Sequence, residues 1–189
     1  MRAVKRTAAV LLLVAPMVAF APARVDAADQ HDIDAAKSTA QFSIEHIFVD
    51  RVTGTVPIVS GSVTTAPGSP MPLAVTAVLD PARIKTDEPD RDAALSGPDY
   101  FDAKNYPTWT FSGKKVTVTG PAECTIEGLL TIHGVAQPER LEVAVRGDAA
   151  HPTYHAIAHI DRHAFGMRGA RLDPVIGNQA DITLDIVVN

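Results

Sequence analysis

Residues 154–161 read Tyr-His-Ala-Ile-Ala-His-Ile-Asp, and every second side chain from Tyr154 to Ile160 belongs to one apolar series. Residues 182–188 repeat this period of two, with a second apolar series that begins at Ile182 and ends at Val188. Successive side chains of a β-strand point to opposite faces of the sheet, so this alternation is typical of a strand with one buried and one wetted face. Both segments are therefore predicted to be strands.

The same alternation recurs along the chain and predicts about eight strands in total. The six other segments are residues 41–48, 52–63, 73–79, 108–118, 126–132 and 141–145. Most connections are short and contain Gly or Pro, and residues 65–72, with three prolines, are expected to form a loop. Many strands joined by short turns favour an antiparallel sheet, closed on itself or folded as a sandwich.

One segment, residues 88–95, departs from the period of two. It reads Glu-Pro-Asp-Arg-Asp-Ala-Ala-Leu, with a proline suited to a helix start and acidic residues in the first turn, and Gly97-Pro98 follows it. We predict a short helix between the third and fourth strands. Such an insertion is expected to cover the mouth of a barrel.

The N-terminus has the three-part layout of a secretory signal. A basic start precedes an apolar run at residues 8–21, and residues 25–27, Val-Asp-Ala, fit the small-x-small cleavage pattern. The apolar run is shorter than the roughly 20 residues that span a bilayer. We therefore expect residues 1–27 to be a cleaved signal peptide, with a cut after Ala23 as the alternative.

Residues 28–189 are long enough to close one core and are expected to form a single domain in the bacterial periplasm. Cys124 is the only cysteine, so the fold is expected to need no internal disulfide. The net charge of the chain is −5, and no Lys/Arg cluster is interleaved with aromatic residues. This charge pattern argues against a nucleic-acid partner.

No motif typical of an enzyme stands in the chain. Ser60, Ser62 and Ser112 lack the Gly-x-Ser-x-Gly context of a nucleophile, and no carboxylates have the spacing of an acid–base pair. No Gly-rich loop leads into a helix, so we expect no nucleotide cofactor. We predict a protein without catalytic residues. A hydrolase or isomerase that uses His46 with an aspartate of the helical insertion is the alternative.

Three histidines, His155, His159 and His163, are spaced by four and invite a metal-site interpretation. On a strand, however, His155 and His159 lie about 13 to 14 Å apart, at roughly 3.4 Å per residue, and cannot share one ion. We therefore expect a row of histidines that faces solvent, and no metal.

Two polar residues, His46 and Arg162, fall at alternating positions that are otherwise apolar, so their side chains are expected to point inward. His46 shares its face with Phe42, Ile44 and Phe48, so its imidazole needs a hydrogen-bond partner, in the core or at the end of a pocket. Arg162 shares the parity of Ile160 and must pair with something. The candidate partners are an aspartate of the insertion region (Asp90, Asp92, Asp99 or Asp102) and a ligand phosphate or carbonyl.

The expected interior combines large and small side chains. Phe42, Phe48, Trp109 and Phe111 fall on inward positions, as does Cys124, and so do the small residues Ala77, Gly128, Ala156 and Ala158. An eight-stranded barrel either is filled by its side chains or leaves space for one small ligand. The small residues hint at a ligand cavity, and a filled, ligand-free structural barrel is the alternative.

Several blocks of the chain, in their order and spacing, resemble the YceI-like family of periplasmic polyisoprenoid-binding proteins. The blocks lie at residues 38–46, 52–56, 90–95, 99–102, 106–112, 128–135 and 160–167, and together they cover nearly all of the chain from Ser38 onward. Two departures stand out: Tyr100 replaces the Phe that is frequent in the family, and the segment 56–58 lacks the usual aromatic. They leave the length and the head group of the ligand open.

The resemblance implies an eight-stranded lipocalin-like barrel around an elongated apolar tunnel. It implies a long prenyl chain inside, such as a quinone or a polyprenyl phosphate, bound for transport or storage. The candidate ligand-binding residues are Phe42, Ile44, His46, Phe101, Trp109, Phe111, Leu130, Arg162 and Phe165. Transient contact with a membrane or a membrane protein is also expected, and a homodimer through the Val187–Val188 end is a further hypothesis.

Overall fold

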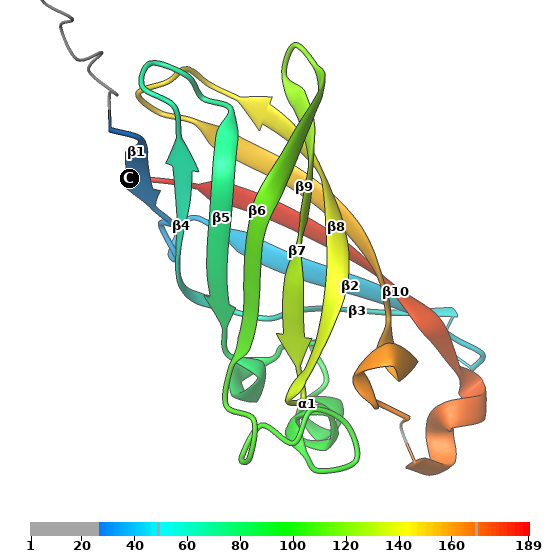
Figure 1. The fold of residues 1–189 in the computed structure, drawn as a ribbon. Helices are drawn as coiled ribbons and strands as arrows, with labels where there is room; N and C mark the ends of the chain where they lie inside the picture. The colour runs from blue at the N-terminus through cyan, green and yellow to red at the C-terminus, as the bar shows by residue number, and fades with distance from the viewer. Residues whose placement is uncertain (1–26, 49, 169) are drawn as a thin grey trace, which may run out of the picture.

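The computed structural model describes residues 27–48, 50–168 and 170–189, so the predicted signal peptide lies outside the described residues apart from Ala27. These residues form one ten-stranded antiparallel sheet in the order β1-β4-β5-β6-β7-β8-β9-β10-β2-β3 (Figure 1). The strands are β1 (Asp29–Asp32), β2 (Thr39–His46), β3 (Asp50–Thr55), β4 (Ile58–Thr65), β5 (Pro72–Leu79), β6 (Trp109–Gly120), β7 (Glu123–Ile132), β8 (Val135–Arg146), β9 (Thr153–Asp161) and β10 (Ile176–Val187).

The all-β, antiparallel prediction is confirmed, but the prediction of a closed eight-stranded barrel is wrong. Pro57 has no backbone N–H to donate, and the strand expected at residues 52–63 is divided there into β3 and β4. The additional strand β1 reads Asp-Gln-His-Asp, which carries no apolar alternation, and it pairs with β4. β1 and β3 stand at opposite ends of the strand order, so the sheet is a curled half-barrel.

The chain partly bridges this opening near the C-terminus. Ile33 forms an isolated bridge with Val188, and the Asp34 amide donates to the Val187 carbonyl over 2.8 Å. Val187 also pairs with Thr153 of β9. The end of β10, which was expected to offer an edge to a second copy, is therefore occupied within the chain.

The helical insertion is confirmed, with a boundary shifted by one residue. Helix α1 (Pro89–Ser96) begins with Pro89 at its first position and carries Asp90 and Asp92 in its first turn. It follows the 3-10 helix η1 (Pro81–Arg83) and lies between β5 and β6. In Figure 1, α1 and its flanking loops lie across one end of the curled sheet.

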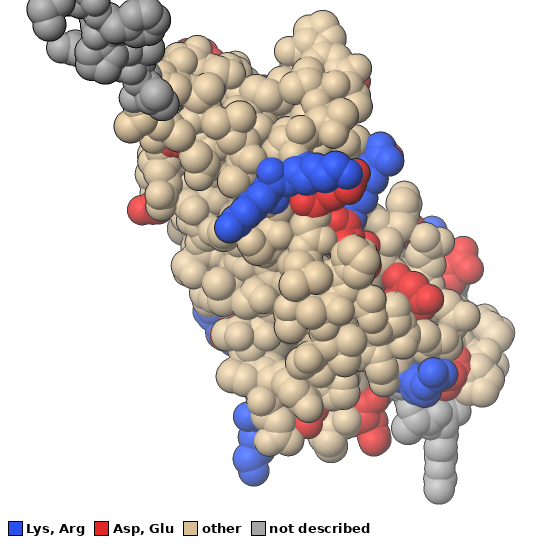
Figure 2. Space-filling model, viewed as in Figure 1, with Lys and Arg blue, Asp and Glu red and all other residues tan. Residues whose placement is uncertain are grey.

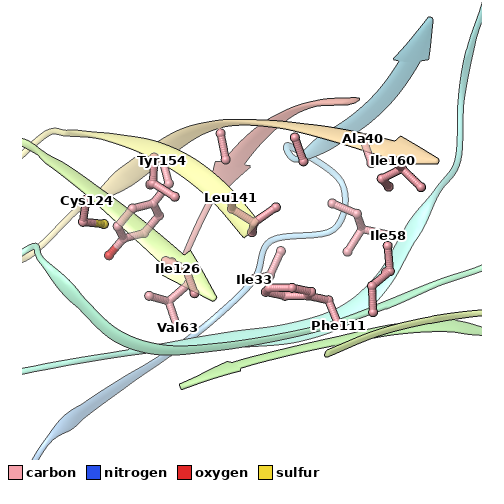
Figure 3. Packing of buried hydrophobic residues seen from close by; sticks show 14 of the residues in the cluster. Ile33, Ala40, Ile58, Val63, Phe111, Cys124, Ile126, Leu141, Tyr154 and Ile160 are labelled. Carbon is pink, nitrogen blue, oxygen red and sulfur yellow. The ribbon is translucent and has the colours of Figure 1, made fainter. Parts of the chain in front are cut away.

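The core lies inside the curl, on the inward face of the alternating strands. Tyr154, Ala156, Ala158 and Ile160 are all buried, as their parity predicts, and Cys124 is a buried free thiol. Figure 3 shows side chains from several strands pointing into this shared interior. Packing of these inward apolar faces therefore holds the sheet in its curl.

The outer surface is mixed in charge. On the face drawn in Figure 2, basic and acidic side chains are interspersed over a surface that is mostly neither. In the part of the chain that the structure describes, no helix is long and apolar enough to cross a membrane.

Candidate functional site

A cavity of about 430 Å³ lies inside the curl of the sheet. Every strand from β2 to β10 contributes side chains to its wall, and α1 with the following loop contributes at one end. Along β10 the lining runs from Ile176 to Ile186, which is about 30 Å of strand at roughly 3.3 Å per residue. The cavity is thus elongated, and its volume falls within the range typical of ligand sites.

The cavity wall is almost entirely hydrocarbon. Val, Ile, Leu, Ala and Phe side chains supply most of it, including Ala77, Ala156 and Ala158, whose small size leaves room inside. Gly128, also expected to make space, plays another part. A Cβ atom at this position would lie 2.6 Å from the Phe111 ring, so the missing side chain makes room for that ring instead.

Most of the predicted ligand-binding residues meet at this cavity. Phe42, Ile44, His46, Phe101, Trp109, Phe111, Leu130 and Arg162 all line it. Phe165 does not: it is completely buried in the 3-10 helix η2 (Arg162–Phe165). Phe48, expected to point inward, lies beyond the end of β2 and is 75% exposed. Contact of the lining residues with a ligand stays a prediction.

Arg162 forms an ion pair that differs from the expected one. Its Nη1 lies 2.6 Å from Asp173 Oδ1, and none of the four aspartates proposed from the sequence is its partner. Asp173 belongs to the 3-10 helix η3 (Ala170–Val175), eleven residues further along, on an irregular segment that no periodicity places. Hydrogen bonds from His163 and Arg162 hold the pKa of the Asp173 carboxyl below its usual range.

All five N–H donors of the Arg162 guanidinium are used within the chain. Besides the Asp173 carboxylate, they reach the backbone carbonyls of Met167, Asp173, Ile176 and Gly177 at 2.8 to 3.2 Å. The guanidinium therefore fastens η2 to the segment that leads into β10. It offers no uncommitted donor to a ligand phosphate or carbonyl.

His46 finds its hydrogen-bond partner locally. Its Nδ1 accepts from the Phe48 amide at 3.3 Å, and the two rings lie 5.9 Å apart. In a neutral imidazole this leaves the proton on Nε2. No aspartate of the insertion is bonded to His46 in the described chain, so the acid–base pair considered from the sequence does not form.

Trp109 closes the wall beneath the insertion. Its ring meets the Phe101 ring edge-on, with centroids 4.6 Å apart. Its Nε1 is buried and has no hydrogen-bond partner among the described residues. The contact couples the loop after α1 to the first residue of β6.

Sequence reasoning missed two charged residues of the wall, Arg91 and Glu139. Glu139 lies on β8, on the same face as Leu141 and Val143, so extending their alternation two residues back would have found it. Burial raises the pKa of the Glu139 carboxyl, and the nearby charge of Asp161 raises it further. Arg91 is placed by α1 and donates to the hydroxyl and the carbonyl of Thr86.

Two members of the histidine row, His155 and His159, face outward as predicted, whereas His163 is half-buried and its Nε2 lies 2.9 Å from Asp173 Oδ1. His155 and His159 project from the outer face of β9 and reach Asp185 and Asp181, each at 2.8 Å. Within the described ranges, no group of three or more His, Cys, Asp or Glu side chains is arranged to hold a metal ion.

Comparison with known proteins identifies the family of this chain. The model of the YceI-like domain matches residues 31–188. The chain belongs to the YceI-like family. It is 25% identical over 173 residues to a UPF0312 protein of Shewanella oneidensis, covering 89% of this chain and 90% of that one. A UPF0312 protein of Pseudomonas putida is 25% identical, covering 84% of this chain and 82% of the relative.

Solved structures share the YceI-like fold. BcnA of Burkholderia cenocepacia superposes with a TM-score of 0.75 at 23% identity, covering 83% of this chain and 99% of that one. A polyisoprenoid binding domain from Saccharophagus degradans, implicated in plant cell wall breakdown, gives 0.68 at 16% identity, with 84% and 97% covered. At these identities the likeness concerns the fold.

Proposed function

We propose that this protein holds a long-chain isoprenoid lipid, of the quinone or polyprenyl phosphate type, in the cavity and carries or stores it in the periplasm. The observation that supports this most is the elongated hydrocarbon wall, which follows β10 from Ile176 to Ile186. Each buried methylene contributes about 0.8 kcal/mol, so a long tail binds tightly with few polar contacts.

The other two hypotheses have less support. A filled barrel would leave no space, yet the inward aromatic side chains leave a cavity of about 430 Å³. For a hydrolase or isomerase, His46 would need a carboxylate partner, and its Nδ1 accepts from the Phe48 amide instead. Membership of the YceI-like family, together with a solved neighbour described as a polyisoprenoid binding domain, also favours binding over catalysis.

The turn between β2 and β3 gives the proposed carrier a contact with the bilayer that supplies its lipid. Ile47 and Phe48 are 72% and 75% exposed, and the Phe48 ring packs beside His46 of the cavity wall. The exposed Phe48 ring thus adjoins a residue of the cavity wall. Ile47 and Phe48, named here the apolar lip, would enter the membrane surface while the tail passes inward.

Native mass spectrometry of the protein from its own periplasm, followed by organic extraction, tests the carrier proposal. The expected result is a co-purified prenyl species that accounts for the mass above that of the chain. A protein that retains no lipid and gains none from long-chain quinones or polyprenyl phosphates would contradict the proposal.

A further inference from the structure

Glu139 is a carboxyl group in a hydrocarbon wall. It lines the cavity beside Leu141 on β8. Among the described residues, no hydrogen bond or ion pair reaches its side chain, and burial together with the charge of Asp161 works against its ionised form. A partly desolvated carboxyl without a partner is costly, and such groups concentrate at functional sites.

Most donors of the two arginines of the wall are committed within the chain, all of them in Arg162 and part of them in Arg91. All five N–H groups of Arg162 donate to Asp173 or to backbone carbonyls. Arg91 directs Nε and Nη2 to Thr86. Among the described residues, Glu139 is therefore an acid of the wall without a partner, while Arg162 has no donor left to offer a ligand.

This arrangement suits one kind of head group. A hydroxyl donates a hydrogen bond to a carboxyl oxygen in either protonation state of the acid. A phosphate brings negative charge toward Glu139, whose carboxyl already experiences the charge of Asp161, and like charges repel.

We propose that Glu139 is the head-group anchor of the cavity and that the preferred isoprenoid ends in a neutral hydroxyl, as a prenol or a hydroquinone does, rather than in a phosphate. This inference rests on the proposed isoprenoid-binding function. It names the substrate class of the same site and assigns its selectivity to one side chain.

The test compares probes that share one tail. Geranylgeraniol, geranylgeranyl monophosphate and the hydrocarbon squalene are titrated into the full-length protein and into Glu139→Leu and Glu139→Gln. The wild type is expected to prefer the alcohol to the phosphate about tenfold, because the alcohol gains a hydrogen bond and avoids the repulsion between like charges. Glu139→Leu should lower alcohol affinity about tenfold and leave squalene affinity unchanged.

Two variants separate the contributions. Glu139→Gln keeps a carbonyl acceptor and loses the charge, so it should retain alcohol binding and gain phosphate binding. Glu142→Leu removes a carboxyl from the exposed face of the same strand and should change neither affinity. Thermal melts of all variants show whether each chain is folded.

The outcomes distinguish the two proposals. If all three probes bind the wild type but the alcohol and the phosphate bind equally, or if Glu139→Leu leaves alcohol affinity unchanged, the anchor is refuted and the carrier function stands. If no probe binds the folded wild type, both proposals fail.

Discussion

Arg162 Nη1 donates to Asp173 Oδ1 over 2.6 Å and joins the end of β9 to the segment that enters β10. Arg162 is almost fully buried, and its removal leaves four backbone carbonyls without this donor and Asp173 with His163 as its remaining partner. We expect Arg162→Met to lower the free energy of unfolding by about 3 kcal/mol. Arg162→Lys should recover little, because one ammonium cannot reproduce the planar fork of donors. Urea denaturation measures both.

The control for this prediction is Arg51→Met, which removes the exposed ion pair with Asp181. An exposed pair contributes little, so its loss should cost under about 1 kcal/mol. If Arg51→Met and Arg162→Met lower the free energy of unfolding equally, the buried hydrogen-bond network of Arg162 contributes no additional stability.

Tyr154 predicts a loss of stability at alkaline pH. Burial raises the pKa of the Tyr154 phenol to about 12, with a smaller contribution from Cys124, and its hydroxyl donates to the Pro70 carbonyl. A raised folded pKa means that stabilisation is complete below the unfolded value, about 10. It is then lost as the pH rises through the folded value.

Tyr154→Phe provides the measurement. At neutral pH the variant should be less stable by about 1 kcal/mol, the contribution of one hydrogen bond. The gap to the wild type should narrow between pH 10 and pH 12, because only the wild-type unfolded chain gains this phenolate. A gap in urea midpoints that stays constant through this range would refute the assignment.

The sequence predicts those parts of the fold that depend on neighbouring residues, and it does not predict those that depend on contacts between distant segments. The parity of β9 follows from neighbouring residues alone, and every inward assignment from Tyr154 to Ile160 is confirmed. β1 has no apolar face in its four residues, and only its pairing with β4 reveals it. The alternation continues across Pro57 and predicts one strand, but the proline, which lacks an N–H, ends β3 before it and β4 begins after it.

The site divides in the same way. Wall residues such as Phe111 and Leu130 were found because an inward side chain on a curled sheet faces the cavity. The Asp173 partner of Arg162 was missed because it depends on the path of the irregular segment after η2. Glu139 has the same parity as Leu141, so alternation alone places it inward. A charged residue does not stand out in an apolar series, and the prediction therefore did not include it.

The apolar lip predicts a kinetic defect. Ile47→Ser with Phe48→Ser removes two side chains that are each worth about 1.5 to 3 kcal/mol when buried. We expect transfer of prenyl lipid from vesicles to slow at least tenfold, since every 1.4 kcal/mol is tenfold. The amount of lipid bound from detergent solution should not change.

Val118→Ser is the matched control for the lip, because Val118 is 60% exposed on β6, near the turn into β7 at the opposite end of the sheet. It should transfer lipid at the wild-type rate. Equal slowing in Val118→Ser and the lip variant would point to general surface hydrophobicity instead.

Filling the cavity tests the carrier function from inside. Ala158 is buried on β9 and lines the wall, so the ring of Ala158→Phe would occupy space meant for the tail. Displacing two methylenes already costs about 1.6 kcal/mol, and we therefore expect lipid affinity to fall about tenfold or more.

Ile157→Phe places the same ring one residue earlier, on the outer face, where Ile157 is 38% exposed, and should bind lipid normally. Both variants should keep the far-UV circular dichroism of a β protein. Undiminished lipid binding by a folded Ala158→Phe would mean that the tail does not occupy this cavity.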